Sequence, residues 1–298
     1  MKSRFDVVLG FDMETDIGSF TEYYNGIQKG TPRLLEILSK HNAPSTFFWT
    51  GHAAEHNAGI VEMVRDADGR MHEIGCHSLV HETLGDPIFP LPNNWPVFPW
   101  EVERRIQEAT RIVETVSGVH PTSFRCPRLW GSTKVTNVLE SLGYKAEASL
   151  PLYFYRTMFK PYHPAADDWT REGDMKIVEI PNFCDLAMTS SDPYNRDRDQ
   201  WPLFRTEGAE KLMGKVKSFI DYVEARKTRP VLCFYLHPWE FYEMPTGALD
   251  YGESEVRPRS FITKNCGDAA VKELDKLLSL LAGLGGEFKT AGGLSDEY

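Results

Sequence analysis

Short apolar runs alternate with amphipathic stretches along almost the whole chain. The apolar runs predict buried strands at residues 5–11, 44–51, 72–76, 121–125, 144–149, 176–181 and 230–236, with an eighth, short strand at 287–290. Between them, apolar residues recur every three or four positions and predict helices at residues 31–38, 57–67, 100–116, 133–142, 207–225 and 265–284. The first helix is expected to begin with Thr31 as its N-cap and Pro32 in its first turn.

Strands that alternate with helices imply a parallel sheet. Over 298 residues, the simplest such arrangement is an α/β fold with a (β/α) barrel of seven or eight parallel strands. No internal repeat, low-complexity tract or linker interrupts the pattern. We therefore expect one domain that covers residues 1–298.

Side chains that can take part in chemistry follow four of the predicted strands. They are Asp12, Glu14 and Asp16 after the first strand, His77 and His81 after the third, Arg125 at the end of the fourth, and His237 after the seventh. In a barrel the carboxyl ends of all strands meet at one rim, where active sites are built. The sequence therefore predicts that these residues converge on one site.

The two histidines His77 and His81 could bind one metal ion. Their spacing of four residues is one helical turn, so we expect both on the first turn of a helix that follows the third strand. With 9 His in the chain, chance gives about 0.3 pairs of this spacing, so the pair alone is a weak motif. Its place among the other strand ends makes a metal site the preferred interpretation.

Composition and charge narrow the class of protein. The net charge of −10 argues against a nucleic-acid or anionic-membrane partner, since both need a basic face. The five Cys are scattered and indicate no disulfide framework. No apolar stretch reaches 18 residues and the first residues lack a signal-peptide core, so we expect a cytoplasmic enzyme that spans no membrane.

Two long loops are predicted, one before the fourth strand and one after the sixth. Residues 85–99 contain five Pro together with Phe89, Trp95 and Phe98, which suits either a binding loop or a rigid surface loop. Residues 184–202 are polar and rich in Asp and Arg, and a solvated surface insert is the favoured interpretation there.

The ordered motifs resemble the polysaccharide deacetylase family, also called the NodB-homology or carbohydrate esterase 4 family. They are Phe-Asp-Met-Glu at 11–14, His-Glu-Ile-Gly-Cys-His-Ser-Leu-Val-His at 72–81, Phe-Arg-Cys-Pro at 124–127 and Leu-His-Pro-Trp at 236–239. The resemblance covers roughly residues 5–240. It implies a distorted barrel of the NodB kind and hydrolysis of an N-acetyl or related non-peptide amide bond. It also implies one divalent metal ion, with Zn²⁺ as the first choice and Co²⁺, Ni²⁺, Mn²⁺ or Fe²⁺ as alternatives.

The resemblance also implies a role for each motif residue. Asp12 is similar to the general base and Arg125 to the arginine that pairs with it. His77 and His81 are similar to metal ligands, and His237 to the general acid.

The first motif departs from the family pattern. Met13 stands where most members have a metal-binding Asp, so Glu14 is the expected carboxylate ligand, with Asp16 as the alternative. This form resembles the branch that contains cytoplasmic cyclic-imide and allantoin-type hydrolases and unusual peptidoglycan deacetylases.

A second departure concerns the substrate. Arg128 stands where the family usually has Tyr. It either faces the pocket and holds an anionic or carbonyl-rich part of the substrate, or pairs with an acid on the surface. The aromatic residues Trp95, Trp130 and Trp239 are further candidates for substrate contact, although Trp239 could equally be a core residue.

The sequence therefore predicts a metal-dependent N-deacetylase or amidohydrolase with a small-molecule or carbohydrate substrate. A cyclic-imide or ureide hydrolase on the same fold is one alternative. A catalytically silent carbohydrate-binding protein is another, because a fold alone does not establish activity. A homo-oligomer is compatible with the sequence.

Overall fold

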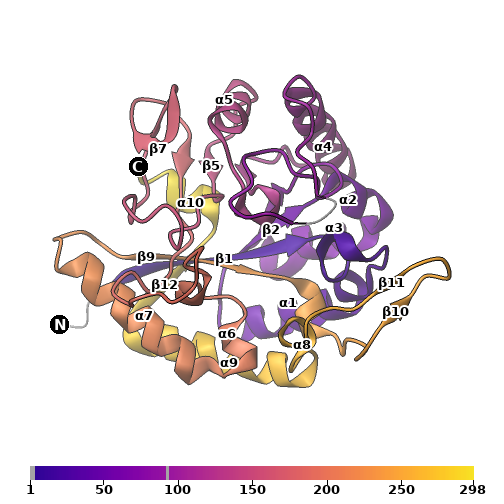
Figure 1. The fold of residues 1–298 in the computed structure, drawn as a ribbon. Helices are drawn as coiled ribbons and strands as arrows, with labels where there is room; N and C mark the ends of the chain where they lie inside the picture. The colour runs from indigo at the N-terminus through magenta and orange to yellow at the C-terminus, as the bar shows by residue number, and fades with distance from the viewer. Residues whose placement is uncertain (1–3, 92–93) are drawn as a thin grey trace.

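A parallel sheet forms the centre of the computed structural model, which describes residues 4–91 and 94–298 (Figure 1). Its strands are β1 (Phe5–Met13), β2 (Thr46–Trp49), β3 (Glu73–Cys76), β4 (Ser123–Phe124), β5 (Ala146–Glu147), β8 (Val178–Glu179), β9 (Val231–Leu236) and β12 (Gly286–Lys289). Every strand pairing in this sheet is parallel, in the order β12-β1-β2-β3-β4-β5-β8. Strand β9 pairs with β1 over residues 6–11.

The sheet curls back toward its own first strand. Asn182, just after β8, forms parallel bridges both to Pro151 and to Cys233 in β9. These bridges connect the last strand of the path to β9, which itself pairs with β1. The prediction of a distorted barrel of seven or eight parallel strands is confirmed.

Helices surround this sheet. They are α1 (Thr31–Lys40), α2 (Gly51–His56), α3 (Ala58–Asp66), α4 (Val102–Ser117), α5 (Thr133–Ser141), α6 (Leu203–Thr206), α7 (Ala209–Glu224), α8 (Ser260–Thr263), α9 (Asp268–Leu284) and α10 (Ala291–Ser295). The six predicted helices correspond to α1, α3, α4, α5, α7 and α9. Among the described residues, no helix combines the length and the apolar character needed to cross a membrane.

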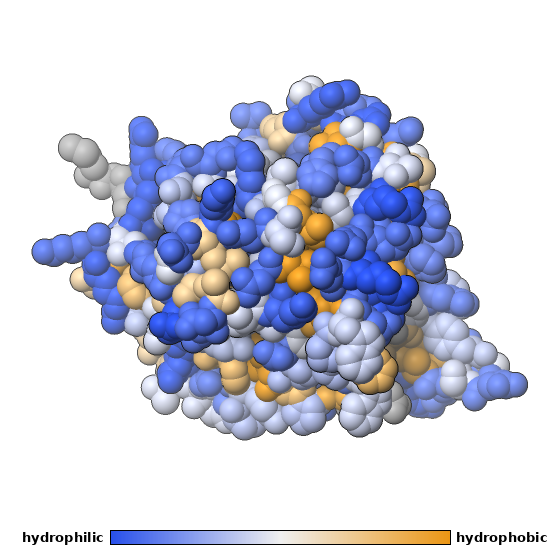
Figure 2. All heavy atoms as spheres, turned by 90° about the horizontal axis from the view of Figure 1, so that it is seen from above, coloured by the Kyte–Doolittle hydropathy of each residue, from blue (hydrophilic) through white to orange (hydrophobic). Residues whose placement is uncertain are grey.

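Two small antiparallel hairpins were not predicted. One consists of β6 (Pro164–Ala165) and β7 (Asp168–Glu172), and the other of β10 (Leu249–Asp250) and β11 (Glu255–Val256). The second hairpin projects from the body of the molecule (Figure 1). Charged and polar side chains cover most of the face seen in Figure 2, with small apolar patches between them.

The prediction of a helix after β3 was wrong. Residues 77–91 and 94–101 contain no helix. Ser78 and His81 have positive φ angles of 70° and 63°, which interrupt the hydrogen bonding of a right-handed helix. The Glu82 carboxylate instead closes a tight turn by accepting hydrogen bonds from Ser78 Oγ at 3.0 Å and from the backbone N–H of Val80 at 2.8 Å.

The predicted N-cap of the first helix was also wrong. A π-helical turn, Gly26–Gly30, runs directly into α1, so Thr31 is already inside the helix and Gly30 occupies the cap position. The Thr31 side chain therefore has no free N–H to cap. Pro32 lies in the first turn, as predicted.

Candidate metal and catalytic site

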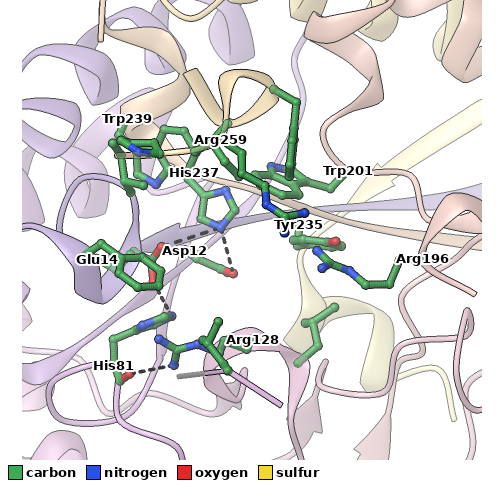
Figure 3. A pocket seen from close by; sticks show the side chains of 18 of the residues that line it. Asp12, Glu14, His81, Arg128, Arg196, Trp201, Tyr235, His237, Trp239 and Arg259 are labelled. Carbon is green, nitrogen blue, oxygen red and sulfur yellow. Dashed lines mark hydrogen bonds and ion pairs between the residues drawn. The ribbon is translucent and has the colours of Figure 1, made fainter. Parts of the chain in front are cut away.

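The predicted residues converge at the carboxyl ends of β1, β3, β4 and β9. A cavity of about 520 Å³ opens there, and Asp12, Glu14, His81, Arg128 and His237 are among the residues that line it. Figure 3 shows these side chains turned toward one another from separate parts of the chain. The convergence expected from a barrel is therefore present in the structure.

Glu14, His77 and His81 form a buried cluster of potential metal ligands. Glu14 Oε2 lies 2.5 Å from His81 Nε2 and 3.8 Å from His77 Nε2. His77 Nδ1 donates to the backbone oxygen of Arg125 at 2.7 Å, so its lone pair is on Nε2, which faces Glu14. The contact between Glu14 Oε2 and His81 Nε2 lacks hydrogen-bond geometry, and His77 Nε2 has no hydrogen-bond partner. Buried polar atoms left without partners around one point fit a bound cation.

The electrostatic environment favours the protonation states that bind metals. Burial raises the pKa of Glu14, but the neighbouring imidazoles of His81, His77 and His237 outweigh it and hold the pKa well below its usual value. Burial lowers the pKa of His81. An ionised carboxylate beside a neutral imidazole is the form in which these groups donate to a metal.

Asp16, the alternative carboxylate ligand, is used elsewhere. Its carboxylate accepts hydrogen bonds from the backbone N–H groups of Gly26 at 2.8 Å and Asn25 at 3.2 Å. These bonds fix the start of the π-helical turn and direct the carboxylate away from His77 and His81. Of the two candidates, only Glu14 joins the cluster.

Asp12 and Arg125 form a buried ion pair beside this cluster. Arg125 Nη1 donates to Asp12 Oδ1 at 2.9 Å, and Arg125 Nε and Nη2 donate to the backbone oxygens of Ala148 and Phe234. The guanidinium crosses the barrel where β1 has Gly10, since a Cβ at that position would lie 2.3 Å from Arg125 Nη1. The other oxygen, Asp12 Oδ2, lies 3.9 Å from His77 Nε2.

His237 reaches the cluster from β9 and is held by Glu240. Its Nδ1 lies 3.1 Å from Glu240 Oε1, and its Nε2 lies 3.7 Å from Glu14 Oε1 and 4.0 Å from Asp12 Oδ2. Burial lowers the pKa of His237, but the hydrogen bond to Glu240 and the nearby carboxylates outweigh it, and the pKa is raised. Glu240 is in turn paired with the buried Arg205.

The candidate substrate contacts fall into two groups. Arg128 lines the cavity and donates to the backbone oxygen of His81 at 3.3 Å, and Trp239 lines it while stacking on His237 at 5.1 Å. Trp130 is only 1% exposed and packs edge-on against Phe89, outside the cavity lining. Trp95 is 80% exposed and also lies outside that lining. The structure therefore does not place Trp130 or Trp95 at the cavity.

The interpretation of residues 184–202 as a solvated insert was wrong. Arg196, Asp199 and Trp201 from this loop line the cavity, and Asp199 is buried and accepts a hydrogen bond from the Tyr235 hydroxyl. Trp201, the aromatic residue near the end of this mostly polar loop, was the one feature of the sequence that could have indicated contact with the cavity. Arg259, from the segment before α8, also lines the cavity, and it belongs to none of the sequence motifs.

Comparison with known proteins connects this site to a family. The family model described as polysaccharide deacetylase matches residues 3–146. A peptidoglycan deacetylase from Helicobacter pylori is 28% identical over 144 residues, which are 48% of this chain and 43% of the relative. This chain thus matches less than half of the length of the first two curated relatives.

Solved structures share the fold over the whole chain. A putative polysaccharide deacetylase from Mycobacterium smegmatis superimposes with a TM-score of 0.65 at 19% identity, covering 100% of this chain and 91% of that structure. An allantoinase superimposes with a TM-score of 0.62 at 13% identity, covering 99% and 89%. The polysaccharide deacetylase model thus matches the N-terminal part of this chain, and the whole chain shares the fold of the Mycobacterium smegmatis structure.

Proposed function

We propose that this protein is a metal-dependent hydrolase that cleaves a non-peptide carbon–nitrogen bond in an N-acyl substrate. One observation carries the proposal. Glu14, His77 and His81 form one buried cluster, Asp12 Oδ2 lies 3.9 Å from His77 Nε2, and His237 Nε2 lies 3.7 Å from Glu14 Oε1 and 4.0 Å from Asp12 Oδ2. The groups that a hydrolytic mechanism needs therefore lie together at the inner end of one cavity, in its lining or directly behind it.

Glu14, His77 and His81 would hold the ion. Two imidazole nitrogens and one carboxylate oxygen suit Zn²⁺ and leave coordination positions open, while Co²⁺, Ni²⁺, Mn²⁺ and Fe²⁺ accept the same donors. When bound, such an ion would polarise the scissile carbonyl and lower the pKa of a water molecule.

Asp12 is the proposed general base. Its Oδ1 is held by Arg125, so Oδ2 is the oxygen available to accept a proton from the attacking water. Because Arg125 is fully buried and hydrogen-bonded on three sides, it fixes the direction of the Asp12 carboxylate.

His237 is the proposed general acid. Glu240 holds the Nδ1–H, so Nε2 is presented to the cavity opposite the Arg128 side (Figure 3). Protonation of the leaving nitrogen by His237 Nε2 would allow that nitrogen to depart as a neutral amine.

The same residues bear on the two alternatives, a catalytically silent protein and a cyclic-imide or ureide hydrolase. A catalytically silent protein would have no need for the base, the acid and the ligand set together. A cyclic imide or ureide remains the alternative substrate, since Met13 and Arg128 replace residues that the sugar-acting members usually share. A cytoplasmic location is part of the same proposal.

A substrate screen tests the proposal. Metal-free protein and protein loaded with Zn²⁺ are each assayed against N-acetylated sugars, cyclic imides and ureides, with Asp12→Asn as the inactive control. We expect turnover of one class that requires both the metal and Asp12. Metal-loaded protein that hydrolyses none of the three classes, or hydrolysis equal in Asp12→Asn, would contradict it.

A further inference from the structure

The cavity carries opposite charges at its two ends. Asp12 and Glu14 lie at the inner end, and Arg196 and Arg259 lie across from them with their guanidinium groups directed toward the cavity (Figure 3). The charge of Asp12 is already balanced by Arg125 behind it. At the outer end, two arginines face one acid, Asp199, which leaves an excess of positive charge in a protein whose net charge is −10.

Arg196 is held in place by an aromatic ring instead of an acid. Its guanidinium lies 4.6 Å from the centre of the Phe89 ring, and it forms no ion pair with any described residue. The loop around it is secured by other side chains, since Arg198 donates to the backbone oxygen of Leu186 and Asp197 accepts from the backbone N–H of Ser191. The Arg196 side chain is thus not needed to hold its own loop.

Arg259 is likewise without an acidic partner among residues 4–91 and 94–298, whereas its neighbour Arg257 pairs with Glu255. The segment that follows Arg259 is anchored, because buried Arg205 donates to the backbone oxygens of Phe261 at 3.2 Å and Ile262 at 2.6 Å. Arg259 therefore projects from a fixed support.

The acid in this wall is already committed. Asp199 accepts hydrogen bonds from the Tyr235 hydroxyl and from the backbone N–H of Gln200 at 2.8 Å, and no contact within 4 Å pairs it with Arg196. Burial raises the pKa of Asp199 to about 6 against the opposing charge of Arg196. Two guanidinium groups at a cavity mouth, each a planar fork of donors, form a surface suited to a carboxylate.

We propose that Arg196 and Arg259 form an anion subsite, and that the substrate carries a carboxylate on the side of the scissile bond away from the metal ligands. The position of the scissile bond rests on the proposed function, whereas the anion subsite stands on the two arginines alone. Arg128 lies beside His81 at the inner end of the cavity and contacts the part of the substrate next to the acyl group.

Binding measurements on Zn²⁺-loaded protein test the subsite without requiring turnover. Calorimetry compares N-acetylmuramic acid and dihydroorotic acid, an N-acetyl sugar and a cyclic ureide, each with its own methyl ester. We expect at least one acid to bind on the order of tenfold more tightly than its ester, the size of a charge-assisted hydrogen bond. Arg196→Gln and Arg259→Gln should each weaken binding of that acid and leave its ester unchanged.

Arg171→Gln is the matched control. It removes the same charge from an exposed arginine on β7 that pairs with Asp167 outside the cavity, and should alter neither affinity. A preference that persists in the Arg196→Gln/Arg259→Gln double variant would mean that the metal binds the carboxylate, and it would overturn the subsite. Equal affinity of the wild-type protein for each acid and its methyl ester would also overturn the subsite. Acid preference without hydrolysis of any substrate would instead reject the proposed function and keep the subsite.

Discussion

Asp12 combines a structural and a chemical task, since it accepts from Arg125 with one oxygen and faces the metal ligands with the other. Asp12→Asn cannot accept a proton from water, so we expect kcat to fall by about 10²–10⁴ while the bound metal is retained. Kinetics and metal analysis on the same sample measure both. Because Asp12→Asn also leaves the buried Arg125 without its charge partner, the melting temperature of the variant must be recorded to show that it is folded. Activity within a few-fold of wild type would make Asp12 purely structural.

His237→Ala should also retain metal. Because the proposed role is protonation of the leaving nitrogen, the loss of rate should be greatest for substrates whose leaving groups depart poorly. A series of N-acyl substrates with different leaving groups measures this dependence. An equal loss across the series would show that His237 does not act as the general acid.

Gly10 is required by the side chain that passes over it. A Cβ at this position would lie 2.3 Å from Arg125 Nη1, and the arginine is packed too tightly to move. We expect Gly10→Ala to lower stability by about 1–3 kcal/mol, the usual size of an overpacking defect. Gly214→Ala, at an exposed position of helix α7 with nothing near its Cβ, should leave stability unchanged or raise it by up to about 1 kcal/mol. Denaturant unfolding of both variants compares them, and equal stabilities would contradict the packing argument.

At the scale of residues, the sequence predicted the groups at strand ends and missed those on loops. Asp12, His77, Arg125 and His237 could be predicted because a parallel barrel brings its strand ends together whatever the loop conformations. Arg196 and Arg259 could not, since no periodicity determines where a long loop folds back. Trp95 and Trp130 were misplaced because an aromatic residue serves a core, a surface or a pocket equally well.

At the scale of elements, β5 and β8 bring two acids side by side inside the barrel. Glu147 and Glu179 are directly paired in the strand register, and both are fully buried. Burial raises the pKa of both carboxyls, and for Glu179 the nearby charge of Glu147 adds to this. At these two carboxyls the folded state binds protons more tightly than the unfolded chain. Their contribution to the free energy of unfolding is therefore fully present below about pH 4.3 and is lost as the pH rises.

Glu147→Gln removes one of these charges and keeps an oxygen that can accept from Thr136. We expect the variant to be more stable than wild type at pH 8, with the difference shrinking as the pH falls to 4. Denaturant unfolding at a series of pH values measures it. A difference that stays constant or grows toward pH 4 would show that the carboxylate is not protonated in the folded state.

The length of an element decided whether the sequence could predict it. Strands β1 and β9 and helices α4, α7 and α9 are long enough for their apolar pattern to be unmistakable. The segment after β3 was predicted as a helix because two histidines four apart suit one. Instead, the segment is an irregular loop. The left-handed conformations of Ser78 and His81 allow the imidazole rings of His77 and His81 to reach Glu14.

At the scale of the whole molecule, metal binding should be coupled to stability. An ion that binds only the folded state stabilises it by about 2.7 kcal/mol when its free concentration is a hundred times Kd. We therefore expect the melting temperature of metal-free protein to rise when Zn²⁺ is added, and this rise to disappear in His77→Ala. An unchanged rise in that variant would place the stabilising ion elsewhere.

A second group of potential ligands must be removed before metal is counted. His52, Glu55 and His56 lie on the exposed face of α2, with ligand atoms close enough to hold an ion. Binding there would add to the measured stoichiometry without any relation to the cavity. The double variant His52→Ala/His56→Ala provides a suitable background, because both side chains are exposed and lie outside the cavity lining.

The most direct test of the metal site is calorimetric titration of Zn²⁺ into metal-free protein in that background. We predict one tight site per chain, which Glu14→Ala and His77→Ala each weaken strongly and which Asp16→Ala leaves intact once its melting temperature shows that it is folded. The same samples should gain hydrolytic activity in proportion to the occupied site. Tight stoichiometric binding that survives both Glu14→Ala and His77→Ala, or that is lost only in Asp16→Ala, would contradict the account.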